Sequence, residues 1–161
     1  MQYQVPLVPQ TSNMSCWAAS IAMILGWKNQ ASYADRLLAQ VNGPGGSNYM
    51  TSYQNGLNPN DKFILRYYGF EIEPPMCYMP GRIKNMLSHW GPLWVATWAP
   101  GPHIRVVTGM SGDTLSINDP APVNRGARYK RSFSQFFGAM ENLGSREMGQ
   151  SSPVYVAYLQ A

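Results

Sequence analysis

An almost uninterrupted apolar run, from Cys16 to Leu25, constrains the fold more than any other feature of the chain. Within it only Ser20 is polar, a polar loop ending at Ser15 comes before it, and Gly26 follows it. Glycine commonly ends helices, and a helix that is apolar on every side has to be buried on every side. We therefore expect a buried central helix that begins at Cys16.

The position of Cys16 at the start of this helix favours a reactive thiolate. The first turn of a helix has N–H groups without intrahelical partners, and the helix dipole stabilises a negative charge there. The thiolate is the nucleophilic form of cysteine. A free cysteine is also a small apolar residue that is often buried for packing alone, so the choice depends on residues elsewhere in the chain.

Two downstream residues have the chemistry that a nucleophilic cysteine needs. The patterns at 103–110 and 114–119 predict two strands joined by a tight turn. His103 begins the first strand and Asp119 ends the second, so the hairpin places an imidazole beside a carboxylate. Cysteine catalysis requires a base for the thiol proton and a group that orients this base.

Asn118 is the alternative to Asp119 as the orienting group. Successive strand residues point to opposite faces of a sheet, so only one of the two can meet His103. We favour Asp119, whose other role would be to cap the turn before Pro120.

Gln10 lies six positions before Cys16, on the loop that leads into the helix. An acyl-transfer site needs hydrogen-bond donors directed at the developing oxyanion. The side-chain amide of Gln10 and the backbone N–H of Cys16 can supply two of them.

The remaining histidine and cysteine are expected to have no catalytic role. His89 falls in the last turn of a predicted helix at 80–90, where a surface or capping role is expected. Cys77 lies in a proline-rich connector and is interpreted as structural. Two cysteines are too few for a disulfide scaffold, and with two distant histidines there is no metal-ligand cluster. We expect neither a metal nor another cofactor.

The composition indicates one globular domain. The chain has 161 residues, 45% of them hydrophobic, which suits a single domain spanning 1–161 with a sizeable core. The net charge is +4, and four basic residues crowd into one segment: Arg125, Arg128, Lys130 and Arg131. That segment lacks the interleaved aromatic residues and the charge density of a nucleic-acid groove. We expect a solvated loop there and no nucleic-acid partner.

No apolar run approaches the length that spans a membrane, and the N-terminus lacks the basic and apolar regions of a readable signal peptide. We expect no membrane partner. If such a protein acts outside its own cell, something else delivers it, or it is one domain of a longer chain.

The order of the predicted elements indicates an α+β fold. Besides the central helix, helices are predicted at 32–41, 58–68, 80–90 and 133–143. Strands are predicted at 92–98, 103–110, 114–119 and 154–159, with extended segments at 2–8 and 70–72. Loops are predicted at 42–60, 99–102, 120–127 and 144–152. Helices first and a hairpin-rich antiparallel sheet later predict two lobes, with the buried N-terminal helix packed against the sheet.

The chain resembles the papain-like cysteine peptidases. The residues that carry the resemblance are, in order, Gln10, Ser15, Cys16, Trp17, His103 and Asp119. The segments 103–109 and 117–120 are closer to compact bacterial members, and are similar to the C39 bacteriocin-processing peptidases and the AvrRpt2-type effector proteases. The resemblance spans 10–120 and implies a papain-like two-lobed fold.

The same resemblance implies a mechanism and a setting. It implies a cysteine endopeptidase acting through a thioester, with Cys16 as nucleophile and His103 as general base and then acid. Asp119 would orient His103, and Gln10 would be an oxyanion donor. The domain would be a secreted effector or toxin, delivered into the cytoplasm of a target cell, with a cognate immunity protein as partner. Its protein or peptide substrates would have small residues such as Gly-Gly before the scissile bond.

Two other classes of function remain open. Transglutaminases, deamidases and arylamine N-acetyltransferases use the same order of Cys, His and Asp and also form a thioester. The position of Gln10 favours peptide hydrolysis over these acyl transfers. A non-catalytic binding module with the same fold is the other class, and the presence of all four residues argues against it.

Overall fold

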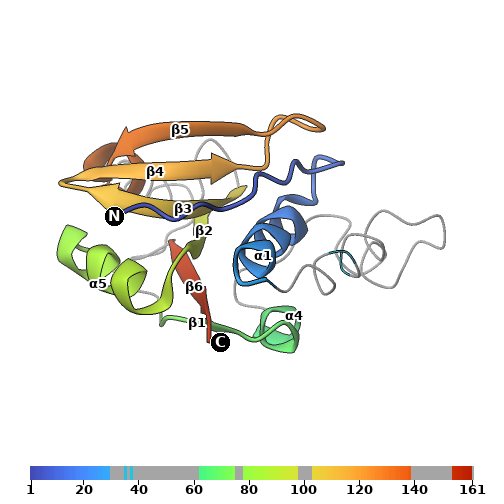
Figure 1. Ribbon diagram of the computed structural model, residues 1–161, viewed down its shortest axis with the longest axis horizontal. Helices are drawn as coiled ribbons and strands as arrows, with labels where there is room; N and C mark the ends of the chain where they lie inside the picture. The colour runs from blue at the N-terminus through green and yellow to red at the C-terminus, as the bar shows by residue number, and fades with distance from the viewer. Residues whose placement is uncertain are drawn as a thin grey trace, which may run out of the picture.

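Six antiparallel strands form one sheet in the part of the chain that the computed structural model describes, which is residues 1–29, 35, 37, 62–74, 78–97, 103–138 and 154–160. The strands lie in the order β1-β6-β2-β3-β4-β5 (Figure 1). Their bounds are β1 (Phe70–Ile72), β2 (Leu93–Thr97), β3 (His103–Ser111), β4 (Thr114–Asp119), β5 (Ala127–Ser132) and β6 (Tyr155–Leu159). The helices are α1 (Cys16–Trp27), α4 (Lys62–Tyr67), α5 (Pro80–Trp90) and a short π-helix, η1 (Ser134–Gly138). The α+β architecture is as predicted.

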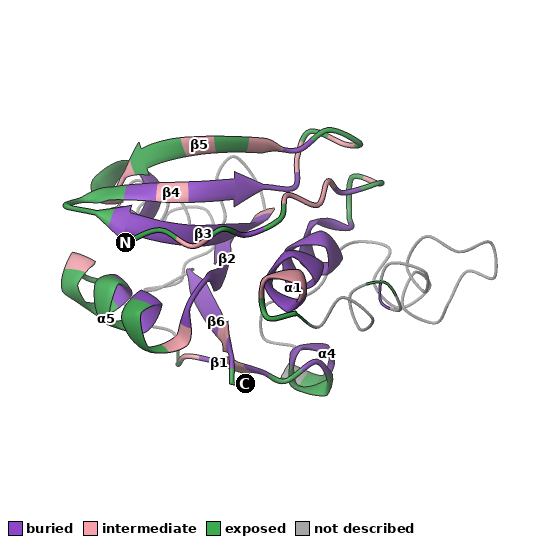
Figure 2. Cartoon of the chain, viewed as in Figure 1, coloured by how far each residue is buried: buried purple, intermediate pink, exposed green. Residues whose placement is uncertain are grey.

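Helix α1 is buried on every side, as its sequence predicts. All residues from Cys16 to Leu25 are buried, and Figure 2 shows the helix as almost entirely buried beside the sheet. It ends at Trp27, one residue beyond Gly26. Because α1 packs mainly on β3 and β2, its N-terminus has a defined position relative to these strands.

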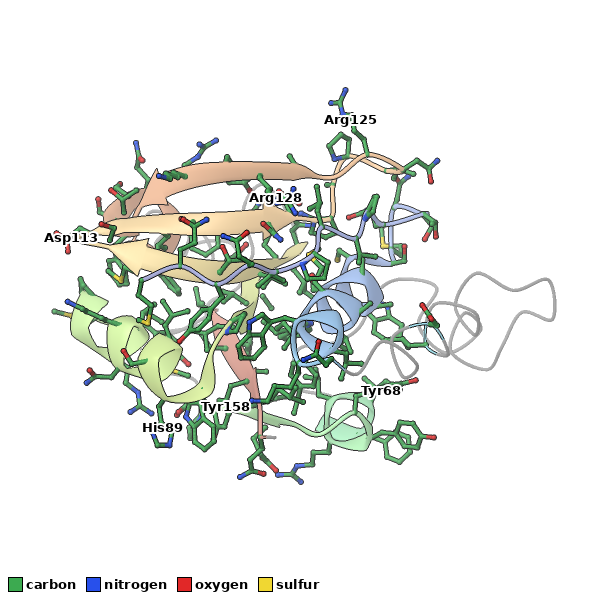
Figure 3. All side chains as sticks on the ribbon, in the orientation of Figure 1. Tyr68, His89, Asp113, Arg125, Arg128 and Tyr158 are labelled. Carbon is green, nitrogen blue, oxygen red and sulfur yellow. The ribbon has the colours of Figure 1, made fainter. Side chains whose placement is uncertain are left out.

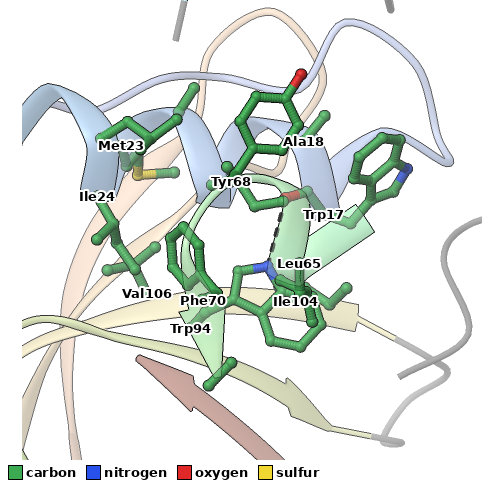
Figure 4. Close-up of a cluster of buried hydrophobic side chains, with 14 of the residues drawn as sticks. Trp17, Ala18, Met23, Ile24, Leu65, Tyr68, Phe70, Trp94, Ile104 and Val106 are labelled. Carbon is green, nitrogen blue, oxygen red and sulfur yellow. Dashed lines mark hydrogen bonds between the residues drawn. The ribbon is translucent and has the colours of Figure 1, made fainter. Parts of the chain in front are cut away.

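The two faces of the sheet have separate hydrophobic cores. Since side chains alternate along a strand, Trp94 and Val106 pack with α1 and α4, whereas Val107 packs with α5 and η1. The indole Nε1–H of Trp94 donates to the backbone carbonyl of Trp17 at 3.4 Å (Figure 4). This hydrogen bond joins the first turn of α1 directly to the central strand β2.

The N-terminal segment, predicted as an extended edge at 2–8, runs beside β3 without forming a regular strand. Gln2 makes an isolated antiparallel bridge with Gly109, and the Tyr3 N–H donates to the carbonyl of Thr108 at 2.8 Å. The Tyr3 hydroxyl also donates to the carbonyl of Leu87 at 2.7 Å. These contacts hold the chain against the sheet before it turns into α1.

Most other predicted elements within the described residues are present. Helix α5 and strand β4 have the predicted bounds, β3 is one residue longer, and β2 and β6 are shorter. The short helix before Gly69 is α4, and the extended segment at 70–72 is β1. The predictions for 42–60, 99–102 and 144–152, and most of the predicted helix at 32–41, lie outside the described residues.

The prediction of a solvated loop for the basic segment is wrong, because most of this segment forms β5, which pairs with β4 at the edge of the sheet. Charged residues are typical of loops, but Lys and Arg are also typical of edge strands, whose free backbone groups they protect from other chains. Arg125 does project from the loop before β5 (Figure 3). The predicted helix at 133–143 begins as the π-helix η1, and its part beyond 138 lies outside the described residues.

Gly91 provides a test of the packing at the end of α5. Its φ of 87° and ψ of −151° form a conformation that is essentially restricted to glycine, and a Cβ here would clash with the Trp27 ring. We expect Gly91→Ala to lower the free energy of unfolding by at least about 2 kcal/mol. For a domain of this size that is a fall in Tm of roughly 5 °C or more, measurable by circular dichroism. Gly81→Ala, at a helical position with open space, is the control and should change Tm little. An unchanged Tm for Gly91→Ala would contradict this packing.

Candidate active site

Cys16 is the first residue of α1 and is only 8% exposed. The preceding Ser15 does not cap the helix with its side chain. Its hydroxyl oxygen instead accepts hydrogen bonds from the backbone N–H groups of Thr11 at 3.3 Å and Ser12 at 3.1 Å. The start of α1 therefore has no side-chain cap from Ser15, and its dipole favours an anion at Cys16.

His103 and Asp119 meet across the hairpin of β3 and β4. The His103 Nε2 lies 2.7 Å from the Asp119 Oδ1. Asn118, the alternative partner, points to the other face of the sheet, where its amide donates to the carbonyl of Val5 at 3.1 Å. The structure thus brings together His103 and Asp119, the pair that the sequence favours.

Asp119 accepts further hydrogen bonds on both of its oxygens. The Ala121 N–H donates to Oδ1 at 2.9 Å, and the Tyr129 hydroxyl donates to Oδ2 at 2.7 Å. Burial favours the neutral acid, but the hydrogen bond and charge of His103, together with the Tyr129 and Ala121 donors, lower the pKa of Asp119. Asp119 is therefore a carboxylate at neutral pH.

The pKa of His103 is shifted in the opposite direction from the one that burial produces. Burial lowers it, but hydrogen bonds to Asp119 and to the side chain of Cys16, with the charges of both groups, raise the pKa of His103 to about 9. The imidazole thus lies between the sulfur and the carboxylate. With Nε2 paired to Asp119, the Nδ1 nitrogen is left for Cys16.

Gln10 joins the loop before α1 to the loop after β4. Its backbone N–H donates to the carbonyl of Pro120 at 2.9 Å, and its carbonyl accepts from the Asn124 N–H at 2.8 Å. The side chain is buried: Nε2 donates to the carbonyl of Ser12 at 2.9 Å, and Oε1 has no hydrogen-bond partner within the described residues. The role of Gln10 as an oxyanion donor stays a prediction.

The other candidates lie apart from this cluster or outside the described residues. His89 is exposed in the last turn of α5 (Figure 3). Its ring is edge-on to that of Trp90, with the two ring centroids 4.4 Å apart. Cys77 belongs to the part of the chain that is not described. Among the described residues, no group of three or more His, Cys, Asp or Glu side chains is placed to hold a metal ion. No helix in the described ranges is long and apolar enough to cross a membrane.

Arg105 and Tyr129 also contact Asp119, and neither was predicted from the sequence. The Arg105 Nε lies 3.2 Å from Oδ2 in an ion pair. Arg105 lies two residues after His103 on the same strand, so the strand period alone placed it on the same face. Tyr129 had no such signal, because the strand that carries it was predicted as a loop.

A cysteine at a buried helix start, next to a histidine that a carboxylate holds, is the arrangement of a cysteine hydrolase. The family described as papain-like cysteine protease AvrRpt2 matches residues 1–141 of the chain. The chain belongs to this family and is a papain-like cysteine protease.

Solved structures share this fold. A double glycine motif protease from an AMS/PCAT transporter, in complex with the leader peptide, is 22% identical, with 96% of this chain and 91% of that one aligned and a TM-score of 0.59. The peptidase domain of Streptococcus ComA, a bifunctional ABC transporter, is 16% identical over 96% of this chain and 98% of its own, with a TM-score of 0.55. These similarities establish the fold. Among curated proteins, none is significantly similar in sequence.

The raised pKa of His103 makes the stability of the protein depend on pH. The ordinary pKa is 6.5 and the value in the folded protein is about 9, so the folded state holds the proton more tightly. This stabilisation is complete below about pH 6.5 and is lost as the pH rises through about 9, with a slope that approaches about 1.4 kcal/mol per pH unit in between. We expect urea denaturation to show that His103→Gln lacks this contribution. If the free energies of unfolding of wild type and His103→Gln change in parallel over this pH range, the raised pKa of His103 is contradicted.

Proposed function

We propose that the protease activity resides in Cys16, His103 and Asp119, with Gln10 as an oxyanion donor. The observation that carries this proposal is the position of His103, whose Nε2 lies 2.7 Å from the Asp119 Oδ1 and whose pKa the side chain of Cys16 also raises. A positioned base next to the thiol and a carboxylate that orients it are the components of an activated nucleophile.

Acylation begins with an ion pair in this scheme. His103 takes the proton from Cys16, and the thiolate attacks the carbonyl carbon of the scissile peptide bond. The oxyanion is stabilised by the backbone N–H of Cys16 and by the side-chain amide of Gln10. For this, the Gln10 amide exchanges its hydrogen bond to the Ser12 carbonyl for one to the oxyanion. The imidazolium of His103 then donates its proton to the leaving amine, and a thioester on Cys16 remains.

Deacylation uses the same groups in the reverse order. His103 removes a proton from water, hydroxide attacks the thioester, and the thiolate leaves as the acid product forms. The pairing of His103 with Asp119 suits the acid step, because the carboxylate stabilises the imidazolium until its proton passes to the amine. Asp119 keeps its charge throughout and stabilises the imidazolium.

We also propose that the protein acts as an effector or toxin. It would be secreted or delivered into a target cell, and a cognate immunity protein would cover the active site in the producing cell. The support for this setting is the membership of the AvrRpt2 family and the resemblance to effector proteases of that type.

We propose peptide substrates with small residues, such as Gly-Gly, before the scissile bond. The support is the shared fold with a double glycine motif protease whose structure contains a leader peptide. A site that accepts only glycine at these positions excludes larger side chains by steric clash.

The nucleophile can be identified by covalent labelling. An irreversible thiol-directed peptidase inhibitor is expected to modify Cys16, as mapped by mass spectrometry. Cys16→Ala should abolish peptidase activity while leaving Tm nearly unchanged, because a buried thiol is replaced by a side chain of similar size. Cys77→Ser and His89→Ala are the controls and should keep activity. Labelling of Cys77 with Cys16 unmodified would overturn the assignment.

The substrate preference requires a separate measurement. For peptides that differ only in the two residues before the scissile bond, kcat/KM for Gly-Gly should exceed that for Leu-Leu by at least about tenfold. A matched Ala-Ala peptide should fall between them. Equal or faster cleavage of the Leu-Leu peptide would refute the Gly-Gly preference and leave the assignment of Cys16 untouched.

A further inference from the structure

Arg105 is a buried cation next to the proposed catalytic pair. It is 7% exposed, and its Nε lies 3.2 Å from the Asp119 Oδ2. The N–H is not aligned for a hydrogen bond, and Nε has no other hydrogen-bond partner in the described chain, so the contact is an ion pair. Burying an arginine is costly unless an anion compensates its charge. Asp119 is the acidic residue within ion-pair distance in the described ranges.

The register of the hairpin explains why these two residues meet. Val106 pairs with Asn118, and Val107 pairs with Ile117. One step further along the same ladder, Arg105 lies opposite Asp119, and directly opposed side chains are in contact distance. The carboxylate therefore has a basic group on each oxygen, with His103 at Oδ1 and Arg105 at Oδ2.

Contacts on Oδ2 restrict the rotation of the carboxylate. The torsion that turns a carboxylate about its own axis is soft, and rotation would carry Oδ1 away from His103. Arg105 acts on Oδ2 by charge, and Tyr129 donates a hydrogen bond to the same atom at 2.7 Å. Oδ1 is in this way held toward His103.

A cavity of about 270 Å³ lies next to this group of side chains, lined by Arg105, Tyr129, Arg131, Gln135 and Phe136. The guanidinium of Arg105 lies over the Phe136 ring, with its central carbon 5.5 Å from the ring centre. Since Arg105 both lines the cavity and contacts Asp119, its removal would extend the cavity to the carboxylate. Water in the extended cavity would then screen the charge of Asp119.

We propose that Arg105 is a positioning residue for the His103–Asp119 pair, which holds Oδ2 and keeps the cavity from reaching the carboxylate. Arg105 is buried and acts on the reaction only through Asp119. Its loss would lower the rate of the chemical step and leave peptide binding nearly unchanged. This inference rests on the proposed roles of His103 and Asp119, although the contact between Arg105 and Asp119 can be tested without any activity.

The first test is chemical rescue of Arg105→Ala in the full chain. We expect kcat to fall by about 10- to 100-fold, the range found when the groups that orient metal-ligating side chains are removed, with KM within about twofold of wild type. Guanidinium chloride, well below denaturing concentration, should raise kcat several-fold, because the ion has the shape and charge of the missing group. Urea has the same shape without the charge and should not raise it.

Arg131→Ala is the matched control. Arg131 lines the same cavity, but it is exposed and stacks on the Tyr129 ring at 4.6 Å without an ion pair to Asp119. It should keep the wild-type kcat and show no response to guanidinium. A folded Arg105→Ala protein with wild-type kcat, a loss confined to KM, or equal rescue by urea would each overturn the proposal.

The second test uses nuclear magnetic resonance and needs no substrate. In wild-type protein, the Arg105 Nε–H resonance should shift with the same midpoint as the carboxyl carbon of Asp119. In Arg105→Met, the pKa of Asp119 should rise, because the positive charge 3.2 Å from Oδ2 is lost. If neither Arg105 variant folds, the titration of the wild-type protein alone tests the contact between Arg105 and Asp119. An Nε–H resonance whose chemical shift does not change as Asp119 is protonated overturns the inference. Coupled titrations in a protein that cleaves no peptide would refute the proposed function and retain the contact.

Discussion

The packing of α1 against β2 and β3 is the interaction on which the rest of the structure depends. The residues of α1 from Cys16 to Leu25 are all buried, so the helix has no polar face to turn toward water and must be enclosed. Its enclosure fixes its first turn, which the hydrogen bond from Trp94 to the carbonyl of Trp17 joins to the sheet. The position of the sulfur therefore follows from hydrophobic burial of the helix behind it.

The electrostatics of the site depend on one carboxylate that serves two basic side chains. Desolvation alone would lower the pKa of His103 and raise that of Asp119, yet the two values are shifted the other way. In a buried setting an ion pair persists only when hydrogen bonds complete it. The donors from Ala121 and Tyr129 supply these hydrogen bonds, and Arg105 adds a second positive charge. The site is organised to keep Asp119 ionised and His103 protonated.

Local patterns in the sequence were sufficient to predict the elements that carry the proposed nucleophile and its base. The uninterrupted apolar run predicted α1, and the strand–turn–strand pattern predicted β3, β4 and the meeting of His103 with Asp119. The failure at β5 has a physical cause: an edge strand with charged side chains has the composition of a loop, and only pairing with β4 reveals it. Tyr129 was missed for the same reason.

The sequence by itself determined the helix, the hairpin and the pairing of histidine with carboxylate, because each depends on hydrogen bonds and side-chain alternation within a short stretch of chain. Tertiary structure decided that Cys16 meets His103, that Gln10 is tied to Pro120 and Asn124, and that Arg105 and Tyr129 share Oδ2 of Asp119. The first two contacts join segments far apart in the sequence. They exist because α1 and the N-terminal segment pack against the sheet. The contacts at Oδ2 follow from the register of three adjacent strands, which no local periodicity encodes.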